Sequence, residues 1–170
     1  MPKFTYAEVG ATRQEPLPEH YNHLRYRVRI GQGEATLQRA GEAVLTYAMH
    51  RRAGAKVRAD TERAKPGARL TVTLGPFTVP CEVVYVLEEP NRIGFGYGTL
   101  PGHQERGEEA FWVERDVDDQ VWLRVTAFSQ PARWPSILGG PIAVLVQQGF
   151  ARLLGRALTR LAAPSRTVGA

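Results

Sequence analysis

The residues best suited to chemistry lie in one short stretch, "YGTLPGHQERGEEAF", which spans residues 97–111. It holds a Pro-Gly turn, His103 and the adjacent glutamates Glu108 and Glu109 between two apolar runs. A histidine beside a carboxylate can exchange a proton with a substrate, so general acid–base catalysis is one interpretation. The same side chains also fit the polar end of a ligand pocket, or a hydrogen-bonded rim that serves only the fold. All three interpretations stay open at this point.

Other groups of reactive residue types offer less. His20 and His23 are close in sequence, but no cysteine or carboxylate set accompanies them at metal-site spacing, so neither a metal nor another cofactor is expected. Gly31 and Gly33 lack the third glycine of a nucleotide-binding loop, and a strand-to-helix turn explains them more simply. Cys81 lies in the apolar run "CEVVYVL", where a buried and unreactive thiol is the ordinary interpretation.

Length and composition place these residues in one globular domain. The chain has 170 residues, of which 43% are hydrophobic, and a chain of this size buries about 70% of its unfolded surface. A single cysteine excludes an internal disulfide framework and fits a reducing compartment, so we expect a cytoplasmic protein. The expected domain covers residues 1–163, with an irregular arm over residues 1–22 and a flexible tail over residues 164–170.

The net charge of +5 comes from arginine rather than lysine, and part of it is regularly spaced. One series alternates as on a strand and another recurs every four residues as on a helix: Arg25, Arg27 and Arg29, then Arg152, Arg156 and Arg160. A track for nucleic acid or anionic lipid is one interpretation. Two solvated faces are simpler, because no nucleic-acid-binding motif accompanies the arginines, and a nucleic-acid partner is not expected. Membrane insertion of residues 141–161 is not expected either, since each arginine near a bilayer centre costs about 2.5–3.5 kcal/mol.

Hydrophobic periodicity predicts the elements that position the reactive stretch. A strand at "RYRVRI" leads into a helical segment over residues 34–50, which Gly41 divides into two short helices if it breaks the pattern. Extended runs separated by turn residues follow. These runs are "KVRAD", "ARLTVTLG", "VPCEVVYVLEE", "RIGFGYGT", "GEEAFWVERD" and "VWLRVTAFS".

A long amphipathic helix is predicted over residues 141–161. Its apolar stripe consists of Ile142, Leu145, Val146, Phe150, Leu153, Leu154, Ala157, Leu158 and Leu161. Antiparallel strands in succession with helices on one side predict an α+β layer architecture. So wide a stripe must be covered, and we therefore expect a curved antiparallel sheet wrapped around this helix, which is the helix-grip arrangement.

Several motifs carry a family resemblance over nearly the whole chain. They are "FTYAEVGATR", "IGQGEATLQRA", "AMHRRAG", "GFGYGTLPGHQERGEEAF" and "AFSQPARWPSILGGPIAVLVQQ". Together they resemble the uncharacterised DUF1990 family, which is grouped with the START-like superfamily of birch-allergen-type lipid binders and polyketide cyclases. One departure is visible, since Tyr47 stands where a tryptophan is typical of the family. The resemblance implies the START-like fold and an interior cavity, and it implies no assigned reaction.

The orientation of the two glutamates depends on strand register. Tight turns centred on Pro101-Gly102 and on Asp118-Asp119 give one apolar face: Ile93, Phe95, Tyr97, Ala110, Trp112, Leu123, Val125 and Ala127. In this register Glu108 lies on the same face, with Ser129 opposite, whereas Glu109 points outward; a slip at Gly107 would exchange the two glutamates. We therefore place Glu108 inward, and expect Glu108→Gln to keep or raise stability, because an unpaired buried charge destabilises.

The function that these features favour is the binding of a small apolar or amphipathic molecule between sheet and C-terminal helix. The expected ligand-binding residues are Phe95, Tyr97, His103, Glu108, Trp112 and Ser129. One alternative is an enzyme of cyclase or dehydratase type that uses His103 with Glu108 or Glu109. Another is a basic module for nucleic acid or anionic lipid. The sequence sets no oligomeric state.

Overall fold

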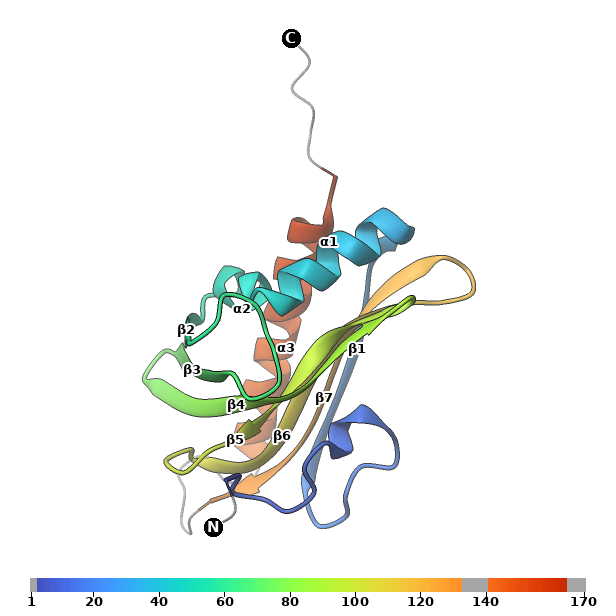
Figure 1. Cartoon of the computed structure of the whole chain (residues 1–170). Coiled ribbons are helices and arrows are strands. Elements are labelled where there is room, and N and C mark those ends of the chain that lie inside the picture. The colour runs from blue at the N-terminus through green and yellow to red at the C-terminus, as the bar shows by residue number, and fades with distance from the viewer. Residues whose placement is uncertain (1–2, 133–140, 165–170) are drawn as a thin grey trace.

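The computed structural model describes residues 3–132 and 141–164. Its centre is a seven-stranded antiparallel sheet with the strand order β1-β7-β6-β5-β4-β3-β2 (Figure 1). The strands are β1 (Asn22–Gln32), β2 (Lys56–Ala59), β3 (Arg69–Leu74), β4 (Phe77–Glu89), β5 (Arg92–Thr99), β6 (Glu105–Arg115) and β7 (Gln120–Pro131). Because β1 pairs with β7, the first and last strands of the chain are neighbours, and the other strands follow one another in hairpins.

Three helices lie on one face of this sheet: α1 (Glu34–Leu45), α2 (Ala48–Arg52) and α3 (Pro141–Ala162). The segment does form two helices, but the break lies at residues 46–47 rather than at Gly41. Helix α1 continues through Gly41, where a Cβ atom would collide with the side chain of Ile93 on β5, and it ends before Tyr47, which has a left-handed φ of 61°. A curved antiparallel sheet with a long C-terminal helix against it confirms the predicted α+β helix-grip fold.

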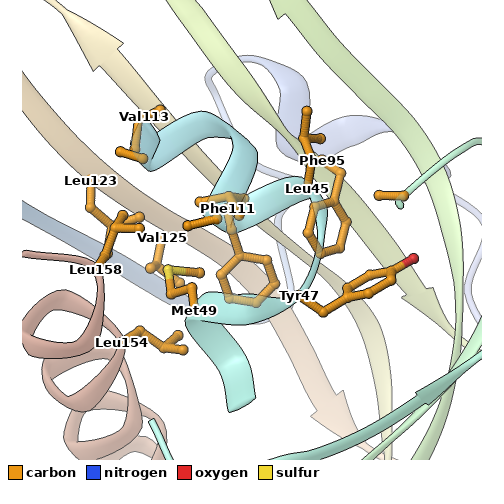
Figure 2. Close-up of a cluster of buried hydrophobic side chains, with 14 of the residues drawn as sticks. Leu45, Tyr47, Met49, Phe95, Phe111, Val113, Leu123, Val125, Leu154 and Leu158 are labelled. Carbon is orange, nitrogen blue, oxygen red and sulfur yellow. The ribbon is translucent and has the colours of Figure 1, made fainter. Parts of the chain in front are cut away.

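The main core fills the space between the sheet and the helices (Figure 2). Phe95 from β5 and Phe111 from β6 pack against Tyr47 and Met49, which lie where α1 passes into α2. Leu154 of α3 packs on the other side of this cluster. All five side chains are fully buried. Burial of this apolar surface, at about 25 cal/mol per Å², is what holds the three helices on the sheet.

The β5–β6 register differs from the predicted one by three residues. Pro101 and Gly102 do form a turn, closed by a 3.1 Å hydrogen bond from the His103 amide to the Leu100 carbonyl. Backbone pairing with β5 does not resume at the turn but begins at Glu108, opposite Gly98, and before that pair Thr99 bonds the Gly107 amide and carbonyl through its side-chain hydroxyl. Tyr97 therefore lies opposite Glu109.

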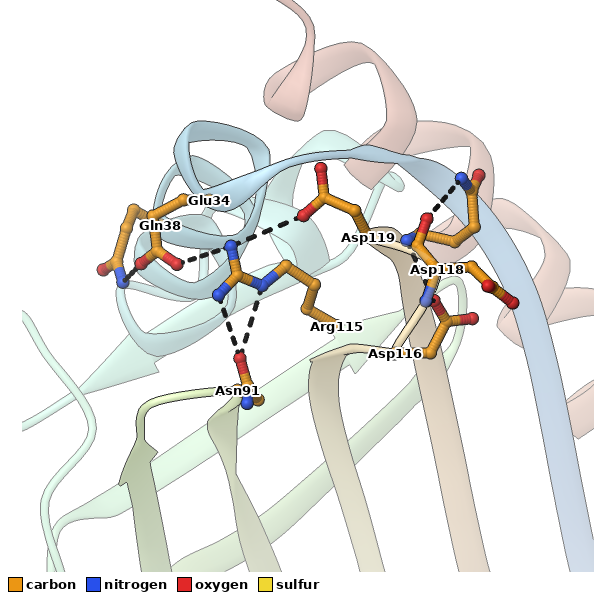
Figure 3. Close-up of polar contacts among 8 residues, drawn as sticks. Glu34, Gln38, Asn91, Arg115, Asp116, Asp118 and Asp119 are labelled. Atoms are coloured by element: carbon orange, nitrogen blue, oxygen red, sulfur yellow. Dashed lines mark hydrogen bonds and ion pairs between the residues drawn. The ribbon is translucent and has the colours of Figure 1, made fainter.

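The β6–β7 register differs by one residue. Asp119 adopts a left-handed φ of 62°, as in a three-residue hairpin loop, and the Asp116 amide bonds the Gln120 carbonyl at 3.0 Å. Arg115 joins this loop to the rest of the fold through Asn91 and Glu34 (Figure 3). Each slip is an odd number of residues, so each inverts the strand faces. The side chains of β6 therefore point to the faces opposite to those predicted, whereas the side chains of β7 point to the predicted faces, because two odd slips add up to an even one.

Helix α3 buries a narrower stripe than its sequence predicts. Leu154 and Leu158 are fully buried, and Gly155 packs directly on Tyr26 of β1. Leu153 and Leu145, which the prediction placed in the core, are 43% and 66% exposed. The helix meets the sheet along one line, so the outer edge of its apolar stripe stays in solvent. The predicted stripe member Ile142 has a side chain outside the described residues.

The opposite face of the sheet is covered by the N-terminal arm, residues 3–21, which includes the short 3-10 helix η1 (Ala11–Arg13). Tyr6 and Leu17 from the arm pack on Phe128 of β7. The predicted tail, residues 164–170, lies outside the described residues except for its first member. In the part of the chain that the structure describes, no helix is long and apolar enough to cross a membrane.

Candidate functional site

A cavity of about 180 Å³ lies between the open end of the sheet and the first half of α3. Strands β3 to β7 and the loop between β5 and β6 form one wall, and α3 supplies the other. The surface of the lining is mostly apolar, and its apolar side chains are Val72, Leu74, Phe77, Val79, Ala127, Val146 and Phe150. The polar lining comes mainly from the reactive stretch: Tyr97, Thr99, His103, Gln104, Glu105, Glu108 and Glu109, with Ser129 and Gln147 beside them.

Glu109 and Tyr97 form the polar pair of the cavity wall. The Tyr97 hydroxyl donates a 3.0 Å hydrogen bond to Oε2 of Glu109. Burial raises the pKa of the Glu109 carboxyl to about 7, against the hydrogen bond from Tyr97, which lowers it, while nearby Glu105 raises it further. Burial also raises the pKa of Tyr97, which stays protonated at neutral pH. The site therefore holds a carboxyl group that changes charge near pH 7.

A second polar group lies at the rim. Gln147 of α3 donates hydrogen bonds to Oε2 of Glu105 (2.9 Å) and to the Ser129 hydroxyl (3.3 Å). The Glu105 amide donates to Nδ1 of His103 at 2.9 Å, which leaves Nε2 of that ring to carry the proton. Burial lowers the pKa of His103 to about 4, so its ring is neutral at pH 7. Neither of the two adjacent glutamates is within hydrogen-bond distance of His103 in the described residues.

The inward placement of Glu108 is wrong. Its carboxylate binds the N-terminal arm on the opposite face of the sheet, where it accepts hydrogen bonds from the Tyr6 hydroxyl (2.6 Å) and the amides of Gly10 (2.7 Å) and Thr12 (3.0 Å). The Thr12 hydroxyl donates a further bond. Glu108 is buried and both its carboxylate oxygens are hydrogen-bonded by the arm, so its charge is not unpaired and Glu108→Gln should lower stability rather than preserve it.

The other five predicted site residues do not all lie in the cavity. Tyr97, His103 and Ser129 line the cavity. Phe95 faces the same side of the sheet but lies deeper, in the closed core. Trp112 was expected inside and instead lies on the other face with Tyr85 and Ala110, because β6 is inverted.

Glu105 and Gln147 are cavity residues that sequence reasoning missed. Glu105 is four residues before Glu109 on one strand, which places both on one face, and that signal was available once Glu109 was taken as the inward glutamate. Gln147 had no comparable signal, because its position depends on how α3 crosses the sheet. In the described residues, no group of three or more histidine, cysteine, aspartate or glutamate side chains is placed to hold a metal ion.

The arginines of β1 point away from the face of the sheet on which α3 and its arginines lie. Leu24, Tyr26 and Val28 face the core, and α3 packs on that side, so the odd-numbered arginines between them face the other way. Arg25 pairs with Glu15 at 2.8 Å, and Arg27 pairs with Glu114 at 3.3 Å. The β1 arginines therefore do not join the arginines of α3 into one basic surface, and part of their charge is neutralised within the fold.

We expect Glu109→Gln to stabilise the protein at pH 8 but not at pH 5. A carboxyl group with a raised pKa contributes stability below its unfolded pKa of about 4.5, and that stability is lost as pH rises towards the folded pKa of about 7. A neutral amide keeps it, so the gain should reach roughly 1–3 kcal/mol at pH 8. Urea unfolding at the two pH values measures the difference. Glu19→Gln, at an exposed position, is the control and should change neither value; equal effects of Glu109→Gln at both pH values would contradict the assignment.

Comparison with known sequences gives one family. The family model described as "Domain of unknown function (DUF1990)" matches residues 5–157. A UPF0548 protein of Deinococcus radiodurans is 36% identical over 172 residues, covering 93% of this chain and 87% of the relative. A UPF0548 protein of Arabidopsis thaliana is 45% identical over 80 residues, covering 44% of this chain and 39% of that protein.

Comparison with solved structures gives the fold. A truncated norcoclaurine synthase from Thalictrum flavum superposes with a TM-score of 0.61 at 10% identity, over 86% of this chain and 96% of the other. The major latex-like protein 151 of Panax ginseng superposes with a TM-score of 0.59 at 14% identity, over 85% and 99% of the two chains. At these identities the likeness concerns the START-like, birch-allergen-type helix-grip fold alone.

Proposed function

The chain belongs to the DUF1990 family, and from this premise we propose that it binds a small, largely apolar molecule in the cavity between its sheet and α3. The observation that carries this proposal is the lining of the cavity. Apolar side chains from three strands and a helix form its body, and polar groups gather at one end. Small-molecule sites typically have this division, with apolar walls for affinity and a few polar groups for orientation.

The half-buried state of several lining residues also supports binding. Leu74, Phe77 and Val79 on the β3–β4 hairpin are only partly covered, although their side chains face a concave surface. Val146 on the facing helix is 46% exposed. A ligand with an apolar body would remove this surface from water, at a gain of about 25 cal/mol per Å².

A structural relative gives the proposal a precedent within the fold. A point mutant of the Thalictrum flavum norcoclaurine synthase, with a TM-score of 0.60 and 12% identity to this chain, is known in complex with a transition-state analogue. The helix-grip arrangement therefore can hold a small molecule. A catalytic His–Glu pair is not part of our proposal, because His103 donates to neither of the neighbouring glutamates.

The test is the binding of a neutral apolar probe, N-phenyl-1-naphthylamine, followed by its fluorescence. We expect saturable binding by the unmodified protein. Val146→Trp adds a large ring to the cavity wall and should weaken binding at least about tenfold, which corresponds to about 1.4 kcal/mol. Leu145→Trp is the matched control, because it adds the same ring one residue away at a position that is 66% exposed and does not line the cavity.

Two results would contradict the proposal. One is the absence of saturable binding by the unmodified protein. The other is an equal loss of binding in the two tryptophan variants, which would place the probe on the exposed outer surface of α3. Thermal melts of both variants show whether the ring has disturbed the fold.

A further inference from the structure

The polar end of the cavity has one sign of charge. Glu105 and Glu109 both line it, and in the described residues neither forms an ion pair with a lysine, arginine or histidine. The lining of the cavity within those same residues contains no lysine or arginine at all. The two buried glutamates elsewhere in the described fold do have partners. Glu82 forms ion pairs with Lys3 and Arg69, and Glu108 accepts hydrogen bonds from the arm.

We infer that the molecule bound in this cavity is an amphipathic amine, whose ammonium group lies beside the Glu109 carboxylate and whose apolar body lies against the residues of β3, β4 and α3. This inference rests on the proposed function, because it names the chemical class of the ligand of that same cavity. The Tyr97 hydroxyl already occupies one lone-pair direction of Glu109 Oε2, so the ammonium would bind the remaining acceptor positions.

The physical reason is the cost of an unpaired charge in an apolar enclosure. A carboxylate removed from water without a counter-ion is strongly disfavoured and takes up a proton instead. An ammonium group supplied by a ligand provides the missing counter-ion, and the attraction is stronger than in water because the surrounding walls are apolar. Glu105 on the same strand face adds negative potential without having to touch the ligand.

Other ligand classes fit this end of the cavity less well. A carboxylate or phosphate ligand would bring a second negative charge to Glu109 and find no guanidinium or ammonium group in the described lining. A neutral alcohol can donate one hydrogen bond to the carboxylate but leaves its charge uncompensated. The expected order of affinity for one apolar body is therefore amine, then alcohol, then carboxylate.

Amine binding should depend on pH through Glu109. Tyr97 from β5, His103 from the preceding loop and Glu105 from the strand itself line the same space, and the core residue Cys81 of β4 lies near Glu109 behind the wall. Tyr97 and Cys81 have raised pKa values and stay protonated near neutrality, while His103 stays neutral. Glu109 is the group whose charge changes in this range, and an ammonium ligand favours its ionised form. Amine affinity should thus fall as pH drops below about 7.

The experiment compares three probes with one eight-carbon chain: octylamine, 1-octanol and octanoate. Each displaces N-phenyl-1-naphthylamine from the unmodified protein at pH 8. We expect octylamine to bind at least about tenfold more tightly than 1-octanol, and octanoate to bind most weakly. Glu109→Gln should remove the preference for octylamine while leaving 1-octanol affinity within about twofold. Glu19→Gln, at an exposed position, should leave the full preference in place.

A second measurement needs no variant. Calorimetric titration of octylamine at pH 7, in two buffers of different ionisation enthalpy, should show the release of a fraction of a proton for each ligand bound, because burial raises the pKa of Glu109 to about 7 and the ammonium favours its ionised form. Titration of 1-octanol should show none.

The outcomes separate the two proposals. If 1-octanol binds and octylamine binds no more tightly, or if octanoate binds best, the amine inference is wrong and the cavity remains a binding site. If octylamine binding releases no proton and survives Glu109→Gln unchanged, the amine inference is also wrong. If neither 1-octanol nor the fluorescent probe binds, the proposed function is wrong and the inference falls with it.

Discussion

Replacing Glu108 with alanine should lower the free energy of unfolding by roughly 3–5 kcal/mol. The carboxylate accepts four hydrogen bonds from Tyr6, Gly10 and Thr12, and it is the main polar tie between the sheet and the N-terminal arm. Hydrogen bonds to a charged group are worth about 1.5–3 kcal/mol each, and the total loss is smaller than their sum because the freed arm can reach water. Chemical denaturation measures this change directly.

Hydrogen exchange shows whether the stability lost in Glu108→Ala comes from release of the N-terminal arm. Loss of Glu108 should expose the amides of Gly10 and Thr12 to hydrogen exchange while the core strands stay protected. Tyr6→Phe removes one of the four bonds and should cost about 1–2 kcal/mol, less when Glu108 is already alanine. A Glu108→Ala protein as stable as the original, or an additive double variant, would show that the arm is held by its apolar contacts instead.

Leu154→Ala should cost roughly 2–5 kcal/mol, as expected for a leucine removed from a closed core. The side chain is fully buried between α3, the sheet and the first two helices, together with Met49 and Phe111 (Figure 2). No neighbouring element can move into the space without breaking other contacts, so most of the transfer energy is lost along with the packing.

Leu153→Ala is the matched control, one residue away on the same helix. Its side chain is 43% exposed, so the same truncation should cost less than about 1 kcal/mol. Urea unfolding of the two variants gives the comparison. Similar losses at both positions would mean that α3 is rotated relative to the sheet, which would also remove Val146 and Phe150 from the cavity wall.

The two adjacent glutamates of the reactive stretch serve opposite faces of one sheet. Glu108 secures the arm on the outer face, and Glu109 faces the cavity. Gly98, directly opposite Glu108 on β5, has no room for a Cβ atom, because the Tyr6 ring of the arm lies over it. This short sequence therefore places a residue that holds the arm next to a candidate binding group, so substitutions of Glu108 should lower stability, whereas substitutions of Glu109 should change ligand binding.

Local patterns in the sequence were sufficient for the fold class. Alternating apolar residues in hairpin succession predicted the strands, and the wide apolar stripe of residues 142–161 predicted the terminal helix. The turn at Pro101-Gly102 was also placed correctly, because proline and glycine fix the backbone angles of those two positions themselves. The family motifs predicted the same helix-grip fold, and this chain superposes on solved structures with that fold.

Which side chains meet in the cavity was decided by the tertiary structure. A turn fixes only its own residues, whereas the backbone pairing of β5 with β6 begins beyond the turn, at Gly98 and Glu108, and is set by the assembly of the whole sheet. The side-chain period of a strand is two, so an odd slip of register exchanged Glu108 for Glu109 and moved Trp112 to the outer face. The sequence thus predicted that one of two adjacent glutamates faces inward, and long-range strand pairing decided that it is Glu109 rather than Glu108.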